Sequence, residues 1–185
     1  MLIRSFASTS PRFGARVFLA TGAVVIGDVT LGDDVNVWYG AVIRGDLNPV
    51  TIGARTNIQD GVVIHVDAPD HPVVVAEDVT VGHTAVLHGC RIERGALVGM
   101  HATVLNDAVV GEEAVVAAGA LVPPGMAVPA RTLVAGVPAR PIRAVTDAEV
   151  EHVRRGVRSY LELKGRYLDA ADVEAGDIDE WERRQ

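Results

Sequence analysis

Apolar and polar positions repeat along most of this chain with a period of six residues. From Ala23 the segments read AVVIGD, VTLGDD, VNVWYG and AVIRGD, and the phase returns after two interruptions, LNP and APDHP, and one slipped step near Cys90. The first position of each six is small or aliphatic, the third is nearly always Val, Ile or Leu, and the fourth is often Gly. This repeat predicts a parallel β-helix, in which three sixes, each a short strand and a corner, close one triangular coil.

The alternative is a β-sandwich of short strands, but a sandwich does not keep one six-residue phase over so many consecutive segments. Stacked coils bury a continuous apolar column, so each coil depends on its neighbours for stability. Aromatic residues make up only 4% of the chain. A core of small and β-branched residues fits narrow, regular strands better than a helical bundle.

The repeat ends in PARTLVAGVPARPIR, where we expect the three prolines between Pro129 and Pro141 to stop further strand pairing. TDAE, from Thr146 to Glu149, then reads as a capping box that starts a helix over about residues 147–168. Apolar residues recur at helical spacing and predict the face that packs on the β-helix: Val150, Val153, Val157, Tyr160, Leu161 and Leu168. We therefore divide the chain into a β-helix, 1–145, and a segment of helix and charged tail, 146–185, in which DIDEWERRQ is mobile or a short helix.

Charge and composition exclude several classes of function. The formal net charge is -7 and no basic stripe is present, which argues against a nucleic-acid partner. No apolar run approaches the roughly 18 residues of a membrane span, and the first residues lack the apolar stretch of a signal peptide. Cys90 is the one cysteine, so no internal disulfide can form, and we expect a reducing cytoplasm. We expect Cys90 to be a packing residue, and Trp38 and Tyr39 to anchor an interface or the helix.

Three residues fall into one column when the coil is used as a ruler. His65 and His88 both occupy the fourth position of a six and are separated by one coil of 18 residues plus the five-residue interruption. Arg44 and His65 are separated by one coil plus the three-residue interruption. Residues one coil apart lie about 4.8 Å apart, the spacing of neighbouring strands. We therefore expect Arg44, His65 and His88 to form one outward-facing column.

Asp60 and His83 form a second column by the same count, on the preceding face of the coil. His83 and His88 should point from different faces, so we expect His83 to join the other two histidines only across an interface with a second copy. A cyclic trimer would then form three equal sites. Three histidines without a fourth protein ligand are typical of a catalytic metal with an open position. The alternative is that these are surface histidines that share a phase by coincidence.

The segments RGDLNP (44–49), NIQDGVVIHVD (57–67) and GHTAVLHGC (82–90) resemble the gamma-class carbonic anhydrases, a family of trimeric, left-handed β-helix proteins. The resemblance implies a homotrimer that interconverts CO₂ and bicarbonate with Zn²⁺, or alternatively Fe²⁺ or Co²⁺, at the subunit interface. It implies the following roles: His65, His83 and His88 as metal ligands, Arg44 and Asp60 as an ion pair across the interface with Asp46 nearby, Gln59 as the residue that orients metal-bound hydroxide or bicarbonate, Asn57 beside the site, and Tyr160 as the family's site tyrosine.

The sequence departs from the most active members of the family in the residues that would export the proton. Leu47 stands where they carry a glutamate, the loop after His65 is short, and Glu162 replaces a helix asparagine. Asp67 or His71 are the remaining candidates for proton transfer. We therefore expect weak CO₂ hydration.

Two other functions remain open at the level of sequence. The same coil is used by acyltransferases that act on coenzyme A compounds, and AGVPAR (135–140) occurs both in them and in the gamma-class carbonic anhydrases. A thioester hydrolase acting on such compounds belongs to the same alternative. Transferases typically use one histidine as a base and need no metal. The third possibility is a non-catalytic assembly module within a larger complex.

Overall fold

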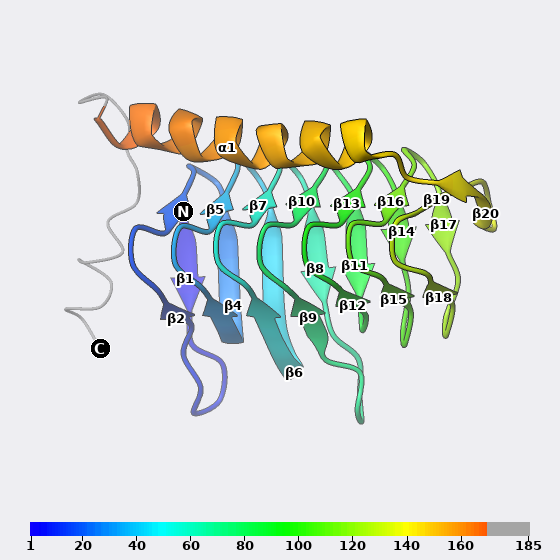
Figure 1. Cartoon of the computed structure of the whole chain (residues 1–185). Coiled ribbons are helices and arrows are strands. Elements are labelled where there is room, and N and C mark those ends of the chain that lie inside the picture. Colours follow the sequence, from blue (N-terminus) through cyan, green and yellow to red (C-terminus); the bar gives the residue numbers. More distant parts are fainter. Residues whose placement is uncertain (170–185) are drawn as a thin grey trace.

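A computed structural model of the chain describes residues 1–169, which form a triangular β-helix of about seven turns and one long helix (Figure 1). The predicted mobile or helical tail, DIDEWERRQ, lies outside the described residues. Among the described residues, no helix combines the length and the apolar character needed to span a membrane.

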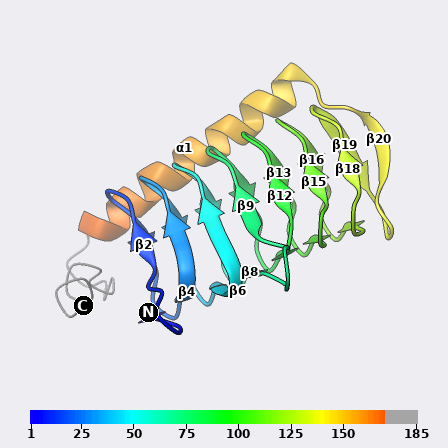
Figure 2. The ribbon, with the colours of Figure 1, turned by 90° about the horizontal axis from the view of Figure 1, so that it is seen from below.

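The strands fall on three faces, and neighbouring coils pair in parallel. The first face holds β1 (Leu2–Arg4), the first part of β4 (Val24–Leu31), the first part of β6 (Val42–Ile52), β8 (Val63–His65), β11 (Val86–His88), β14 (Thr103–Val104) and β17 (Leu121–Val122). The second face holds β2 (Arg12–Phe13), the later parts of β4 and β6, β9 (Val73–Val75), β12 (Arg91–Ile92), β15 (Val109–Val110) and β18 (Ala127–Val128), which lie side by side in Figure 2.

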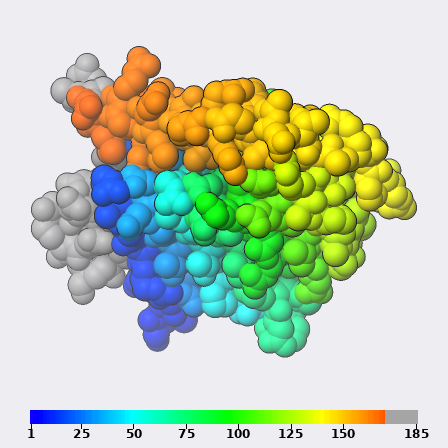
Figure 3. All heavy atoms as spheres, viewed as in Figure 1, coloured from blue at the N-terminus to red at the C-terminus, as the bar shows by residue number. Residues whose placement is uncertain are grey.

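The third face forms a separate eight-stranded sheet. It holds β3 (Phe18–Leu19), β5 (Asn36–Val37), β7 (Asn57–Ile58), β10 (Thr80–Val81), β13 (Leu97–Val98), β16 (Val115–Val116), β19 (Thr132–Ala135) and β20 (Arg140–Ala144). The helix α1 (Asp147–Asp169) runs along the prism over the β5 and β10 side (Figures 1 and 3).

The core consists of the first and third residues of each six, as the repeat predicts. On the first face Val25, Ile43, Ile64, Leu87 and Val104 point inward, and each is fully buried. A one-residue shift of any coil would move these side chains to the surface. The burial of the inward residues therefore fixes the register of every outward residue.

The slipped step is absorbed at Gly89, where a five-residue segment replaces a six. Gly89 has φ +55, and a Cβ there would approach Asn106 Oδ1 to 2.8 Å and His71 Cβ to 2.9 Å. Cys90 consequently takes an inward position beside Ile92 and is only 3% exposed. Burial raises the pKa of its thiol to about 12. The packing role expected for Cys90 agrees with this position.

The expectation that prolines end strand pairing is wrong. β19 continues the parallel ladder from β16, and β20, which contains Pro141, then pairs with β19 in the antiparallel direction. The register shifts between Leu133 and Val134, and all five residues of β20 are exposed. A proline is tolerated in β20 because an edge strand has no neighbour that needs the missing N–H.

The helix begins with the predicted capping box. The Thr146 backbone N–H donates to Glu149 Oε2 at 2.9 Å, and the Glu149 backbone N–H donates to Thr146 Oγ1 at 3.3 Å. The buried face differs from the expected one in its second half. Leu168 is 48% exposed, and Lys164 is buried in its place.

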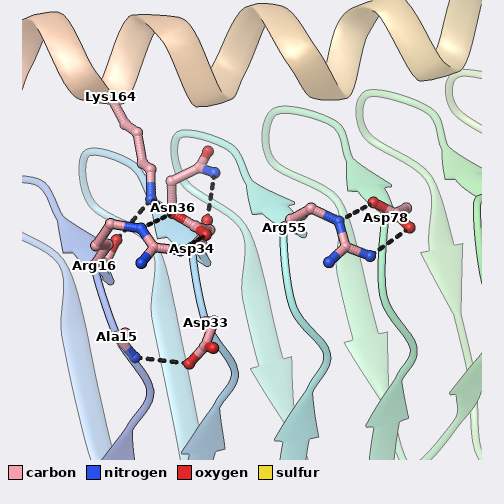
Figure 4. A network of polar contacts seen from close by, with 8 residues as sticks. All are labelled: Ala15, Arg16, Asp33, Asp34, Asn36, Arg55, Asp78 and Lys164. Carbon is pink, nitrogen blue, oxygen red and sulfur yellow. Dashed lines mark hydrogen bonds and ion pairs between the residues drawn. The ribbon is translucent and has the colours of Figure 1, made fainter.

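Aromatic side chains and one buried lysine attach α1 to the β-helix. Trp38 packs against Phe18, Tyr160 and Tyr167 with ring centroids 5.1 to 5.4 Å apart, so Trp38 is the anchor for the helix that the sequence analysis expected. Lys164 Nζ donates to the Arg16 carbonyl oxygen at 2.6 Å and to Asp34 Oδ1 at 2.7 Å (Figure 4). The hydrogen bond from Arg16 is the main reason that the pKa of Asp34 is lowered to about 2.

Replacing Lys164 with Met should lower the free energy of unfolding by about 1–3 kcal/mol, because it removes two hydrogen bonds and leaves their acceptors partly buried. Urea denaturation at pH 7 and equal protein concentration measures the change. The matched control is Arg166→Ala on the exposed side of the same helix, which should change stability by less than about 0.5 kcal/mol. Equal stability of the two variants would contradict the anchoring role of Lys164.

The Cys90 thiol should not react with a thiol reagent in the native protein at pH 7–8, because it is buried and its pKa is raised. In denaturant it should react completely, and the signal is unambiguous because the sequence contains one cysteine. Rapid modification of the folded protein would show that this part of the core opens.

Candidate metal centre

Arg44, His65 and His88 stack on neighbouring strands as the residue count predicts. Arg44 of β6 is in register with His65 of β8, and His65 is in register with His88 of β11. The two imidazole centroids lie 5.2 Å apart, and His65 Nδ1 is 3.3 Å from His88 Nε2. The predicted column is therefore confirmed.

The distance between these two nitrogen atoms fits a shared metal ion. Two nitrogen ligands at 2.0–2.1 Å from a tetrahedral zinc lie about 3.3–3.4 Å apart. The opposite nitrogen of each ring is held by an oxygen: His65 Nε2 lies 2.9 Å from Asp46 Oδ1, and His88 Nδ1 lies 2.6 Å from Asn106 Oδ1. Because both oxygens are acceptors, each ring donates there and turns a lone pair toward the other ring.

Asp60 and His83 form the second predicted column, at the turns that precede β8 and β11. The Thr84 backbone N–H donates to the Asp60 carbonyl oxygen at 2.8 Å, which keeps the two turns in register. His83 Nδ1 lies 2.8 Å from Asp60 Oδ2, and the two side chains are 42% and 44% exposed. His83 Nδ1 therefore donates to Asp60, and in the neutral ring the lone pair lies on Nε2.

The two columns stand at opposite ends of the strands of the first face. Within residues 1–169, no group of three His, Cys, Asp or Glu side chains could hold a metal ion. His65 and His88 are brought together, whereas His83 lies apart from them. One chain thus supplies two halves of the predicted site, and they do not meet within it.

The Arg44–Asp60 ion pair implied by the family resemblance does not form within the chain. Arg44 pairs instead with Asp46, and Asp60 contacts His83. The side chains of Arg44 and Asp60 are 41% and 44% exposed, so each can reach a second copy.

Asn57, Gln59 and Tyr160 lie with the His83 half. Gln59 Nε2 donates to Asn57 Oδ1 at 3.2 Å, and Gln59 Oε1 accepts the His83 backbone N–H at 3.1 Å. Asn57 Nδ2 donates in turn to Thr80 Oγ1 at 2.9 Å. Tyr160 of α1 packs on Trp38, and its pKa is raised, first by burial and then by the charge of Asp60.

Asn106 contacts the predicted ligand His88, although the repeat did not predict this contact. Its Nδ2 donates to Asp67 Oδ2 at 3.0 Å while its Oδ1 accepts from His88. Asn106 follows His88 by 18 residues, one nominal coil, but the shortened step at Gly89 places it one position beyond the histidine column. The five-residue length of the segment that ends at Gly89 could have predicted this position of Asn106.

The face between the two half-sites carries an apolar stripe. Its outward residues at successive coils are Val24, Val42, Val63, Val86, Thr103 and Leu121, and Val63 is 39% exposed. The second face is more mixed: its outward residues are Arg12, Thr30, Thr51 and Arg91 together with Val74, Val109 and Ala127. The third face is covered by α1. The first face is therefore the one suited to burial against another copy.

No protein-family model matches the chain. Individual proteins match it over most of its length. The chain is 50% identical over 147 residues to the "Probable carbonic anhydrase" of Methanocaldococcus jannaschii. The aligned region covers 80% of this chain and 92% of that protein. It is 42% identical over 159 residues to "Gamma carbonic anhydrase 2, mitochondrial" of Arabidopsis thaliana, over 83% of this chain and 57% of that protein.

A solved structure of a hexapeptide transferase family protein from Anaplasma phagocytophilum superposes with a TM-score of 0.86 at 36% identity, over 90% of this chain and 98% of that chain. The match confirms the predicted fold class, a left-handed parallel β-helix of hexapeptide repeats with one C-terminal helix.

Proposed function

The chain belongs to the gamma-class carbonic anhydrase family, and from this membership we propose that it is a metal-dependent hydratase that interconverts CO₂ and bicarbonate. Within the structure, the observation that carries the proposal is the 3.3 Å separation of His65 Nδ1 and His88 Nε2. Both rings are held from behind by oxygen atoms, which is the arrangement of metal-ligating histidines in proteins. His65, His83 and His88 are the proposed ligands.

The third imidazole comes from a second copy in a homotrimer. The apolar stripe on the first face supports this assembly, since it lies between the two half-sites and would be buried at the interface. The register supports it as well. If His83 docks beside the His65–His88 pair, Asp60, one coil earlier, docks beside Arg44 and His65. The Arg44–Asp60 ion pair across the interface follows from the same docking.

Three neutral imidazoles and an open fourth position suit Zn²⁺, with Fe²⁺ and Co²⁺ as alternatives. Zinc in such a site makes a water molecule acidic enough to lose a proton near neutral pH. Asp46, Asn106 and Asp60 each accept a hydrogen bond from one nitrogen of one histidine, which fixes the rotation of that ring and leaves its other nitrogen to bind the metal.

Gln59, Asn57 and Tyr160 serve the substrate. Gln59 Oε1 accepts the His83 backbone N–H, and one N–H of Gln59 Nε2 donates to Asn57. The second N–H of this amide would orient bicarbonate or the attacking oxygen. Asn57 fixes the orientation of that amide. Tyr160 keeps its proton because its pKa is raised, so its hydroxyl can donate a hydrogen bond to an anion at the site.

Export of the proton is the slow part of this proposal. Leu47 is 55% exposed and carries no proton. The two other candidates are engaged in fixed contacts: Asp67 accepts from Asn106 and from the Ala68 backbone N–H, and His71 pairs with Asp107. We expect turnover well below that of a carbonic anhydrase with a free carboxylate beside the site.

The competing functions make different demands on the same protein. An acyltransferase or thioester hydrolase would bind coenzyme A compounds, and the solved structure of the Anaplasma protein bears a transferase family name. An assembly module would need no turnover at all.

We place the working protein in the cytoplasm, with residues 1–145 supplying the ligands and 146–185 the helix and tail.

The proposal is tested by two variants that damage opposite halves of the site. His83→Ala alone and the double variant His65→Ala with His88→Ala should each lose zinc and CO₂ hydration as homotrimers. Coexpressed, they should form mixed trimers in which about one interface in three joins an intact pair to an intact His83. Zinc content and hydration should return to up to about a third of the wild-type value.

Arg91→Ala on the second face is the matched control and should leave both quantities unchanged. No recovery in mixed trimers, or full metal content in either homotrimer, would contradict the shared site. Coenzyme A binding by metal-free wild-type protein, without zinc uptake, would favour the transferase.

A further inference from the structure

His88 is held by a chain of two side chains that come from other parts of the fold. Asn106 lies one coil later, and Asp67 lies in the loop between β8 and β9, which projects from the lower side of the prism in Figures 1 and 3. The contacts run from Asp67 Oδ2 to Asn106 Nδ2 at 3.0 Å, and from Asn106 Oδ1 to His88 Nδ1 at 2.6 Å.

The carboxylate of Asp67 gives this series of hydrogen bonds one direction. An ionised carboxylate only accepts hydrogen bonds, so Asp67 requires the NH₂ end of the Asn106 amide. The carbonyl end is then turned toward His88 and can only accept, which places the ring proton on Nδ1 and the lone pair on Nε2. Nε2 is the atom that lies 3.3 Å from His65 Nδ1.

The surroundings of Asp67 and Asn106 leave these hydrogen bonds little freedom to rearrange. Asp67 Oδ1 accepts the Ala68 backbone N–H at 2.9 Å, and the Asp67 carbonyl oxygen accepts Asn48 Nδ2 at 2.6 Å. On the other side, a Cβ at Gly89 would lie 2.8 Å from Asn106 Oδ1. The loop is therefore tied at two points, and the backbone at Gly89 passes directly beside the amide.

We propose that Asn106, oriented by Asp67, is a positioning residue that fixes the tautomer and rotation of His88 and so prepares Nε2 to bind the metal. This inference rests on the proposed function, since His88 is the ligand it serves. Asn106 touches neither the metal nor the substrate, and its effect passes through the imidazole. Outer partners of ligating histidines typically contribute 10–100-fold in metal affinity.

The first measurement uses metal-free protein, so it does not depend on the loaded site. Ring ¹⁵N chemical shifts at one pH at which the imidazoles are neutral should report a single Nδ1–H tautomer for His88 in the wild type. In Asn106→Leu the acceptor is gone, and a mixture with the Nε2–H tautomer should appear. Zinc affinity, measured by competition with a chelator, should fall about 10–100-fold in the same variant.

A charge swap tests whether the direction of the chain matters. When Asn106→Asp is combined with Asp67→Asn, the carboxylate now at position 106 can accept from His88. The amide now at position 67 can donate to that carboxylate while its oxygen still accepts the Ala68 N–H. The pair should restore the tautomer and most of the lost affinity, whereas Asp67→Asn alone should not keep a single tautomer. The matched control is Asp107→Asn, since Asp107 pairs with His71 and its side chain is 62% exposed.

Four results test the positioning role of Asn106 and the proposed function. An unchanged tautomer in Asn106→Leu, or an affinity within about twofold of the wild type, would overturn the positioning role. A folded charge-swap variant that restores neither quantity would also overturn it. Wild-type protein that takes up no zinc but still shows the Asn106-dependent tautomer of His88 would support the hydrogen bonds from Asp67 to His88. The same result would contradict the proposed function.

Discussion

The register of the stacked coils is the constraint on which this structure depends. Each inward residue, such as Ile64 or Leu87, is fully buried between its counterparts in the neighbouring coils. Because side chains alternate in direction along a strand, a slip of one residue would expose the whole core. The outward residues therefore have no freedom to choose their neighbours. The proximity of His65 and His88 follows from the burial of Ile64 and Leu87, not from an attraction between the imidazoles.

The insertions are tolerated because they leave this register intact. The five-residue APDHP loop leaves the core between two coils and returns in phase, so His65 and His88 stay paired across it. The loop also carries polar groups back to the site, since Asp67 at its base reaches Asn106. The shortened step at Gly89 has a similar effect, because it moves Cys90 inward and brings Asn106 behind His88. Irregularities in the repeat thus place the residues that support the proposed ligands.

Sequence periodicity predicted the parts of the molecule that the core determines. The strands, the two histidine columns and the capping box at Thr146 all follow from patterns within a few residues or one coil. It failed where a partner distant in sequence decides the outcome. Lys164 is buried because Asp34 and the Arg16 carbonyl oxygen lie beneath it, and no helical pattern reports that. β20 forms despite Pro141 because it lies at an edge. The role of Asn106 depends on a hydrogen bond that crosses from one coil to a loop.

The proposed site has one metal ion shared between two chains. The most direct measurement is a crystal structure of the zinc-loaded protein with anomalous scattering recorded at the zinc edge. We expect one peak at each of three equivalent interfaces, bound by His65 Nδ1 and His88 Nε2 of one chain and His83 Nε2 of its neighbour. A peak bound within a single chain, or zinc-loaded trimers in which His83 lies far from every peak, would contradict it.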